Sequence, residues 1–97
     1  MDYTWNETKR AENLRRHHLD FLDADLVYES SHKLTVPTTR LADREPRWAD
    51  FAEVHGVVLK LVYTLHQGTI RCISLRVASR KERRLYHEAQ QNRPLHE

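Results

Sequence analysis

The chain has 97 residues and a formal net charge of +2, with 39% hydrophobic and 31% charged residues. This length suits one compact domain, and the composition is typical of a globular rather than a disordered protein. No apolar run approaches the roughly 20 residues that span a bilayer, and the first residues lack the basic and apolar regions of a signal peptide. We therefore expect one cytoplasmic domain over residues 1–97, without membrane association, and a frayed tail from about residue 92.

The first third of the chain predicts two helices. Asn6 can cap a helix over residues 7–17, which contains neither glycine nor proline. The inner stripe of this helix should consist of residues at helical spacing, namely Ala11, Leu14 and His18. Asp20 is a second candidate cap, and it predicts a short helix over residues 21–28.

The middle of the chain predicts strands joined by tight turns. Four strands are expected, over residues 33–38, 48–54, 57–63 and 70–76. Pro37 confines the first of them to a sheet edge or a strand end, because proline donates no ladder hydrogen bond. Strict alternation in the last strand would send Arg71, Ile73 and Leu75 to one face and Ile70, Cys72, Ser74 and Arg76 to the other. Residues 41–46 are polar and predict a loop.

The last element is predicted from a capping box. Ser79 can cap a helix while Glu82, three residues later, reaches back to the cap, and the helix should run to about Gln91. Strands joined by tight turns form antiparallel sheets. The sequence therefore predicts an α+β domain with N-terminal helices, an antiparallel sheet of about four strands and a C-terminal helix.

Metal and thiol chemistry find little support. The seven histidines and the one cysteine form neither an HExxH nor a CxxC pattern, so no metal and no other cofactor is expected. Cys72 lies in an apolar strand and is better interpreted as a buried, inert thiol than as a nucleophile.

A basic run from Arg71 to Arg84 contains six basic residues and one acid, Glu82. Arg76 would end a strand, and the next helix begins directly after it; a helix N-terminus favours anions. With Arg80 and Arg83 on one side of that helix, these residues predict a phosphate site. Lys81 and Arg84 fit a solvated helix face, with Lys81 as a peripheral phosphate contact.

Two aromatic motifs allow alternative interpretations. An acid, a base and an aromatic ring stand together at the start of a predicted strand, namely Glu45, Arg47 and Trp48. This group fits either a functional site or a surface salt bridge beside a core tryptophan. Tyr3 and Trp5 could stack on bases, although aromatic residues before a helix more often fix that helix to the core.

Several motifs in order resemble the BrnT toxin family. The segments that carry the resemblance are Tyr3–Lys9, Asn13, Arg16–Phe21, Glu45–Trp48, Leu61–Thr64 and Arg71–Tyr86. The chain departs from the family pattern at three points: His18 or Leu19 stands where the family has glycine, Pro46 replaces a second glutamate, and Val77 replaces a basic residue. The resemblance implies a RelE-like fold and a ribonuclease toxin. It also implies a cognate antitoxin, BrnA, whose DNA-binding portion represses the shared operon.

The resemblance leads to a specific hypothesis, a metal-independent endoribonuclease that cleaves mRNA by attack of the RNA 2′-OH on its own phosphate. The expected catalytic residues are Arg76 and Arg80 at the transition state, Arg47 on a neighbouring phosphate, and Glu45 or His18 as the base. Further RNA contacts are expected from Arg71, Arg83, Lys81, Lys9 and Trp5. The toxin would meet operator DNA only through its antitoxin.

Two alternatives compete with the ribonuclease. A non-catalytic nucleic-acid-binding or protein-interaction module, in effect a degenerate toxin, is favoured by the departures at Pro46 and Val77. A metalloenzyme would lose its activity in excess chelator.

Overall fold

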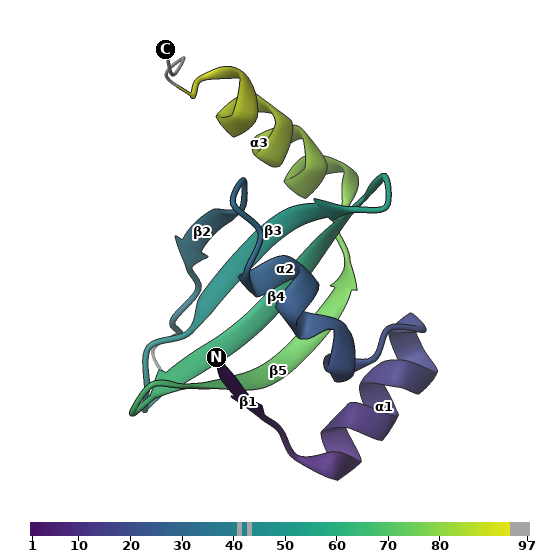
Figure 1. The fold of residues 1–97 in the computed structure, drawn as a ribbon, viewed down its shortest axis with the longest axis vertical. Coiled ribbons are helices and arrows are strands. Elements are labelled where there is room, and N and C mark those ends of the chain that lie inside the picture. The colour runs from purple at the N-terminus through teal and green to yellow at the C-terminus, as the bar shows by residue number, and fades with distance from the viewer. Residues whose placement is uncertain (41, 43, 94–97) are drawn as a thin grey trace.

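The computed structural model of the chain describes residues 1–40, 42 and 44–93, and within them five strands form one sheet in the order β1-β5-β4-β3-β2 (Figure 1). The strands are β1 (Asp2–Thr4), β2 (Leu34–Pro37), β3 (Trp48–Val54), β4 (Val57–His66) and β5 (Thr69–Val77). The α+β class is confirmed, and β2 to β5 pair antiparallel as predicted. The expectation of about four antiparallel strands needs one correction, because β1 adds a fifth strand parallel to β5. The placement of Pro37 in an edge strand is confirmed.

Three of the helical elements begin directly after the caps that the sequence predicts, whereas the helix predicted over residues 21–28 is divided into a 3-10 turn and a short α-helix. They are α1 (Glu7–His17), the 3-10 turn η1 (Phe21–Asp23), α2 (Ala24–Tyr28) and α3 (Arg80–Gln91). The side chains of Asn6 and Asp20 accept hydrogen bonds from the next helical N–H groups, and both halves of the Ser79–Glu82 capping box are formed. Figure 1 shows α2 across the sheet, α1 beside β5, and α3 extending beyond the end of the sheet. Parts of the predicted loop (residues 41 and 43) and of the predicted tail (residues 94–97) lie outside the described residues.

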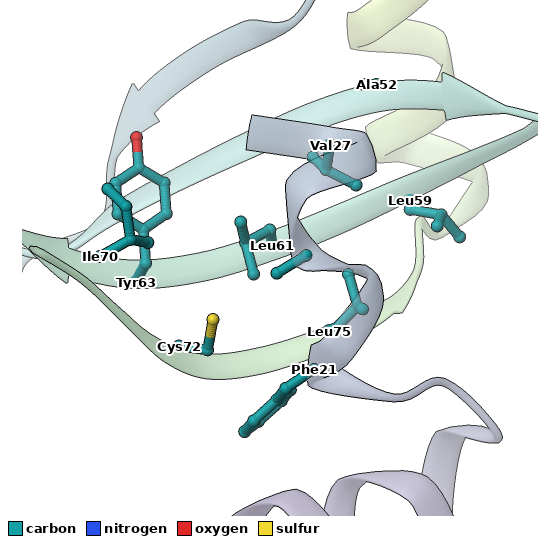
Figure 2. Packing of buried hydrophobic residues seen from close by; sticks show 10 residues of the cluster. Phe21, Val27, Ala52, Leu59, Leu61, Tyr63, Ile70, Cys72 and Leu75 are labelled. Carbon is teal, nitrogen blue, oxygen red and sulfur yellow. The ribbon is translucent and has the colours of Figure 1, made fainter. Parts of the chain in front are cut away.

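The main core lies on the face of the sheet that η1 and α2 cover, which we call the helix face. Phe21 and Val27 pack there on side chains from β4 and β5, including Leu61 and Leu75 (Figure 2). A smaller cluster lies on the opposite face, where Tyr86 of α3 packs with residues of β3 and β4. Tyr86 is the buried residue of α3, and most other residues of this helix are exposed. The first turns of α3 therefore touch the sheet, while much of its length is exposed to solvent.

A bulge in β5 changes which side chains share a face. Val62 pairs with Ser74 and Tyr63 pairs with Cys72, so Ile73 has no partner on β4. The extra residue resets the alternation of the strand. Both Cys72 and Leu75 therefore lie on the helix face, and the prediction of strict alternation is wrong at this point (Figure 2).

The bulge also brings two arginines to one face. Arg71 pairs with Thr64 and Arg76 pairs with Lys60, and cross-strand partners point to the same face. Thr64 and Lys60 alternate with the helix-face residues of β4. Arg71 and Arg76 thus both lie on the opposite face, although strict alternation would send residues five positions apart to opposite faces.

The buried residue of α1 is polar. Only 7% of Asn13 is exposed, whereas Leu14 is 44% exposed and Ala11 and His18 are also exposed, so the predicted apolar stripe is wrong. The Asn13 amide donates to the carbonyls of Leu75 at 2.8 Å and Leu19 at 3.0 Å, and its oxygen accepts from the Leu75 N–H at 3.1 Å.

This contact, the Asn13 clamp, completes the edge of β5. Strand β1 ends at Thr4, opposite Arg71, so it does not reach the backbone of Leu75. The amide of Asn13 supplies both the acceptor and the donor that a neighbouring strand would offer there. The clamp therefore fixes the rotation of α1 against the sheet.

We predict that Asn13→Ala lowers the free energy of unfolding by about 2–3 kcal/mol, because it leaves buried backbone groups of Leu75 without partners. Urea denaturation of the wild type and the variant measures this loss. Leu14→Ala on the same helix is the control and should change stability by at most about 0.5 kcal/mol. Similar losses in the two variants would contradict the clamp.

Candidate active site

Three adjoining hollows form a groove along β5, which we call the β5 groove. The first has a volume of about 390 Å³ and is lined by Asn6, Lys9, Ala42, Arg44, Glu45, Arg47, Thr64, Arg71, Cys72 and Ile73. The second, between α1 and β5, is lined by Lys9, Glu12, Asn13, Arg16, His17, Ile73 and Ser74. The third, at the turn between β4 and β5, is lined by Thr4, Glu45, Thr64, His66, Gln67, Thr69 and Arg71. Neighbouring hollows share lining residues, so the groove is continuous.

The first hollow gathers positive charge from three separate segments. Its described lining includes Lys9 from α1, Arg44 and Arg47 from the segment before β3, and Arg71 from β5, against the single acid Glu45. Arg71 is exposed, and no acidic residue in the described part of the chain pairs with it. The hollow is therefore suited to a phosphate group.

Backbone hydrogen bonds position Arg47 at the entrance to β3. Its N–H donates to the Thr39 hydroxyl at 2.9 Å, and its carbonyl accepts from the Thr38 N–H at 2.9 Å. These bonds fix the backbone beside β2, so Arg47 enters the hollow from an ordered position.

Glu45 lies where the first and third hollows meet. Its carboxylate is 3.7 Å from Nδ1 of His66, and both side chains are at least half exposed. An acid and an imidazole at this separation can exchange protons with a ligand in the groove. From the sequence, His66 is only a turn residue; its approach to Glu45 depends on the fold.

The groove collects four of the residues predicted from the sequence: Lys9, Glu45, Arg47 and Arg71. Four other residues that line the groove were not predicted from the sequence as site residues: Arg44, Arg16, His17 and His66. Arg44 adjoins the Glu45–Trp48 motif, and Arg16 and His17 lie in a segment that carries the family resemblance, so these motifs were the available signal.

Arg76 lies apart from the groove and binds Glu82. Its guanidinium donates two hydrogen bonds to the Glu82 carboxylate, at 2.8 and 2.9 Å. Lys60 donates to the same carboxylate at 2.9 Å, and the Ser79 N–H donates at 2.8 Å. Glu82 therefore joins β4, β5 and the start of α3.

The pKa of Glu82 reflects this environment. Burial alone would raise the pKa, but hydrogen bonds from Arg76, the Ser79 N–H and Lys60 outweigh burial and hold it well below its ordinary value. Glu82 is therefore a carboxylate that compensates the charge of Arg76.

The other predicted site residues lie outside the groove. Arg80 and Lys81 are exposed on α3, and Arg83 donates to the Ala78 carbonyl at 3.0 Å. His18 ends α1 in the left-handed conformation, with φ of 58°, so it takes the conformation for which glycine is usual.

The two N-terminal aromatic residues are held by the fold. The Trp5 ring packs at 6.3 Å from that of Phe21, and its indole N–H donates to Glu7 at 3.0 Å. The hydroxyl of Tyr3 donates to Glu29 at 2.6 Å. Both contacts support the interpretation that these rings fix the start of α1.

Cys72 is 2% exposed, and burial raises the pKa of its thiol to about 11, which makes it a poor nucleophile. Among the described residues, no group of three or more His, Cys, Asp or Glu side chains is placed to hold a metal ion. No helix in the same part of the chain is long and apolar enough to span a membrane.

Comparison with protein families supplies the chemistry. A family model described as ribonuclease toxin, BrnT, of type II toxin–antitoxin system matches residues 5–82. The chain belongs to this family. The matched range contains every described residue that lines the first two hollows, and it also contains the Arg76–Glu82 pair. A search of curated proteins finds no match. As a ribonuclease toxin of a type II system, the protein acts on RNA and has a cognate antitoxin.

We predict that Glu82→Gln lowers the free energy of unfolding at pH 7 by about 1.5–3 kcal/mol, because it removes charge-assisted hydrogen bonds from Arg76 and Lys60. Glutamine can keep the capping box, so the helix start is retained. Glu88→Gln, an exposed change on the same helix, is the control and should have little effect.

The same variant should flatten the dependence of stability on pH. Because the pKa of Glu82 is lowered in the folded state, its contribution is present above the unfolded pKa of about 4.3 and is lost progressively as the pH falls below that value toward the folded pKa. Asp20, whose pKa is lowered by a hydrogen bond from Arg10, should keep part of this slope in the variant. Denaturation curves from pH 3 to pH 7 test this, and equal slopes in the two proteins would contradict it.

Proposed function

We propose that this toxin is a metal-independent endoribonuclease that cleaves mRNA in the β5 groove and acts in the cytoplasm. The observation that carries the proposal is the first hollow, whose described lining brings Lys9, Arg44, Arg47 and Arg71 together with the carboxylate of Glu45. Cleavage of RNA by its own 2′-OH needs cations for the charge on phosphorus, a base for the hydroxyl and an acid for the leaving oxygen. Side chains in the groove can supply each of these.

The reaction needs no co-reactant. Glu45 takes the proton from the 2′-OH, and the 2′-oxygen forms a bond to phosphorus while the bond from phosphorus to the 5′-oxygen breaks. His66, beside Glu45, gives a proton to the leaving 5′-oxygen. The products are a 2′,3′-cyclic phosphate and a 5′-hydroxyl. Arg47 and Arg71 stabilise the charge that develops on the phosphate oxygens.

We assign to Arg71 the catalytic role that the sequence predicted for Arg76. The guanidinium of Arg76 is bound to Glu82 through two hydrogen bonds, so its charge is compensated before RNA arrives. We assign Arg76 as a positioning residue for α3. Arg80, Lys81 and Arg83 would then be outer contacts to RNA, and His18, outside the groove, has no role in the reaction.

A binding module without catalysis is the second candidate, because Pro46 and Val77 depart from the family pattern. Neither residue lines any of the three hollows, so the departures leave the proposed catalytic groups in place. This favours the ribonuclease.

The antitoxin partner follows from the charge of the groove. We propose a BrnA-like antitoxin that covers the β5 groove with an acidic or amphipathic segment, since complementary charge orients association. Contact with operator DNA would occur only through the antitoxin.

We predict that the purified toxin cleaves mRNA in excess chelator and leaves 2′,3′-cyclic phosphate ends, because the reaction uses side chains alone. Gel analysis of end-labelled RNA measures both features, and RNA with a 2′-deoxy residue at the cleaved position is the control that should resist. Loss of cleavage in chelator would indicate a metalloenzyme. Binding without cleavage would indicate the non-catalytic module.

We predict that Arg71→Ala lowers kcat by roughly 10²–10³-fold without lowering the melting temperature, as expected for loss of one group that stabilises transition-state charge. Arg84→Ala, an exposed change on α3, should leave kcat within about twofold. Arg76→Ala should lower the melting temperature, because it leaves Glu82 partly uncompensated. A larger loss of kcat in folded Arg76→Ala than in Arg71→Ala would return the catalytic role to Arg76.

A further inference from the structure

One face of α1 lines the second hollow. The residues that line it from this helix are spaced at i, i+3, i+4, i+7 and i+8: Lys9, Glu12, Asn13, Arg16 and His17. The Asn13 clamp holds this face against Leu75, so the rotation of the helix directs Arg16 and His17 toward β5. The neighbouring Arg15 is exposed and lines none of the three hollows.

The second hollow continues directly from the first. Lys9 and Ile73 line both of them. Ile73 is the extra residue of the bulge in β5, and it lies half-buried between the two hollows. Its apolar side chain offers a surface for a base or a sugar, while Lys9 can contact a phosphate placed between the hollows.

The third hollow continues from the first at the other end. Glu45, Thr64 and Arg71 line both of them. Along β5 the groove runs from Thr69 to Ser74, five steps of ~3.3 Å, or about 17 Å. Such a groove is long enough for several consecutive nucleotides of a strand.

We infer that the β5 groove binds single-stranded RNA over three consecutive nucleotides, and that Lys9, Arg16 and His17 hold the nucleotide beside the cleaved bond. The inference rests on the proposed function and adds the form of its substrate. Arg16 offers a planar fork that matches two phosphate oxygens, and no acidic residue in the described part of the chain pairs with it. The hollows have volumes of about 390, 220 and 380 Å³, which suit single nucleotides rather than a duplex.

The test combines ligand length with a matched pair of variants. The probes are 2′-O-methyl uridine oligonucleotides of one to five residues, which bind but cannot be cleaved. Wild-type affinity should rise up to three nucleotides and then change little. Arg16→Ala should weaken binding of the trinucleotide by about tenfold, the loss of one charge-assisted hydrogen bond, and should leave binding of the mononucleotide unchanged.

Arg15→Ala removes the same charge from the same helix and should weaken binding of either probe by less than about twofold. Arg16→Lys keeps the charge but loses the fork, so its trinucleotide affinity should lie between those of the wild type and Arg16→Ala. Melting curves show that the variants are folded.

The outcomes separate this inference from the proposed function. Equal losses in Arg15→Ala and Arg16→Ala would mean a diffuse basic surface and would overturn the inference. Affinity independent of length, in a toxin that still cleaves RNA, would overturn the inference and leave the proposed function intact. A wild-type chain that neither cleaves nor binds RNA would overturn both.

Discussion

The extra residue in β5 is the constraint on which the site depends. Without the bulge at Ile73, alternation would place Cys72 and Leu75 on opposite faces, and it would place Arg71 and Arg76 on opposite faces too. One arginine would then enter the main core or one apolar side chain would leave it. Burial of an uncompensated charge costs several kcal/mol, and burial of a leucine gains about 1.5–3 kcal/mol. The bulge therefore lets one strand serve both the core and the groove.

The Asn13 clamp depends on the same strand. Because β1 is short, the edge of β5 near Leu75 would be left without a partner, and a helix with little apolar surface cannot cover it by hydrophobic packing. The side-chain amide of Asn13 meets both needs, because it forms hydrogen bonds with the backbone of Leu75 and thereby holds α1 against the sheet. The cationic face of α1 is thus directed by a buried polar contact rather than by an apolar stripe.

Local features of the fold were predictable from the sequence, because their causes lie within a few residues. The caps at Asn6, Asp20 and Ser79 form within their own turns, and the strand at 48–54 is bounded as predicted. Features that depend on distant partners were not predictable. The bulge breaks the period from which faces were assigned, and β1 is only three residues long and needs β5 as its template. The predicted apolar stripe of α1 was wrong because hydrophobic periodicity takes only apolar residues into account, whereas the buried residue of this helix is the polar Asn13.

The site was predictable in part, for the same reason. Glu45, Arg47 and Arg71 belong to motifs that can be read along the chain, and the fold brings them together. Only one of the two roles of Glu82 was predictable from the sequence. Its place in the capping box is local, whereas its contacts with Lys60 and Arg76 depend on the position of α3 on the sheet.

The basic residues fall into two groups: those paired with a carboxylate, which stabilise the fold, and those without such a partner among the described residues, which are available to bind phosphate. Glu82 already neutralises part of the charge of Arg76 and Lys60, so the basic run from Arg71 to Arg84 overstates the attraction for phosphate at the start of α3. The cations of the groove differ, because Arg71 and Arg16 come from separate elements and have no acidic partner among the described residues. A phosphate that enters the groove therefore gains their charge without first displacing a carboxylate. At the start of α3, the same phosphate would have to break two short hydrogen bonds between Arg76 and Glu82.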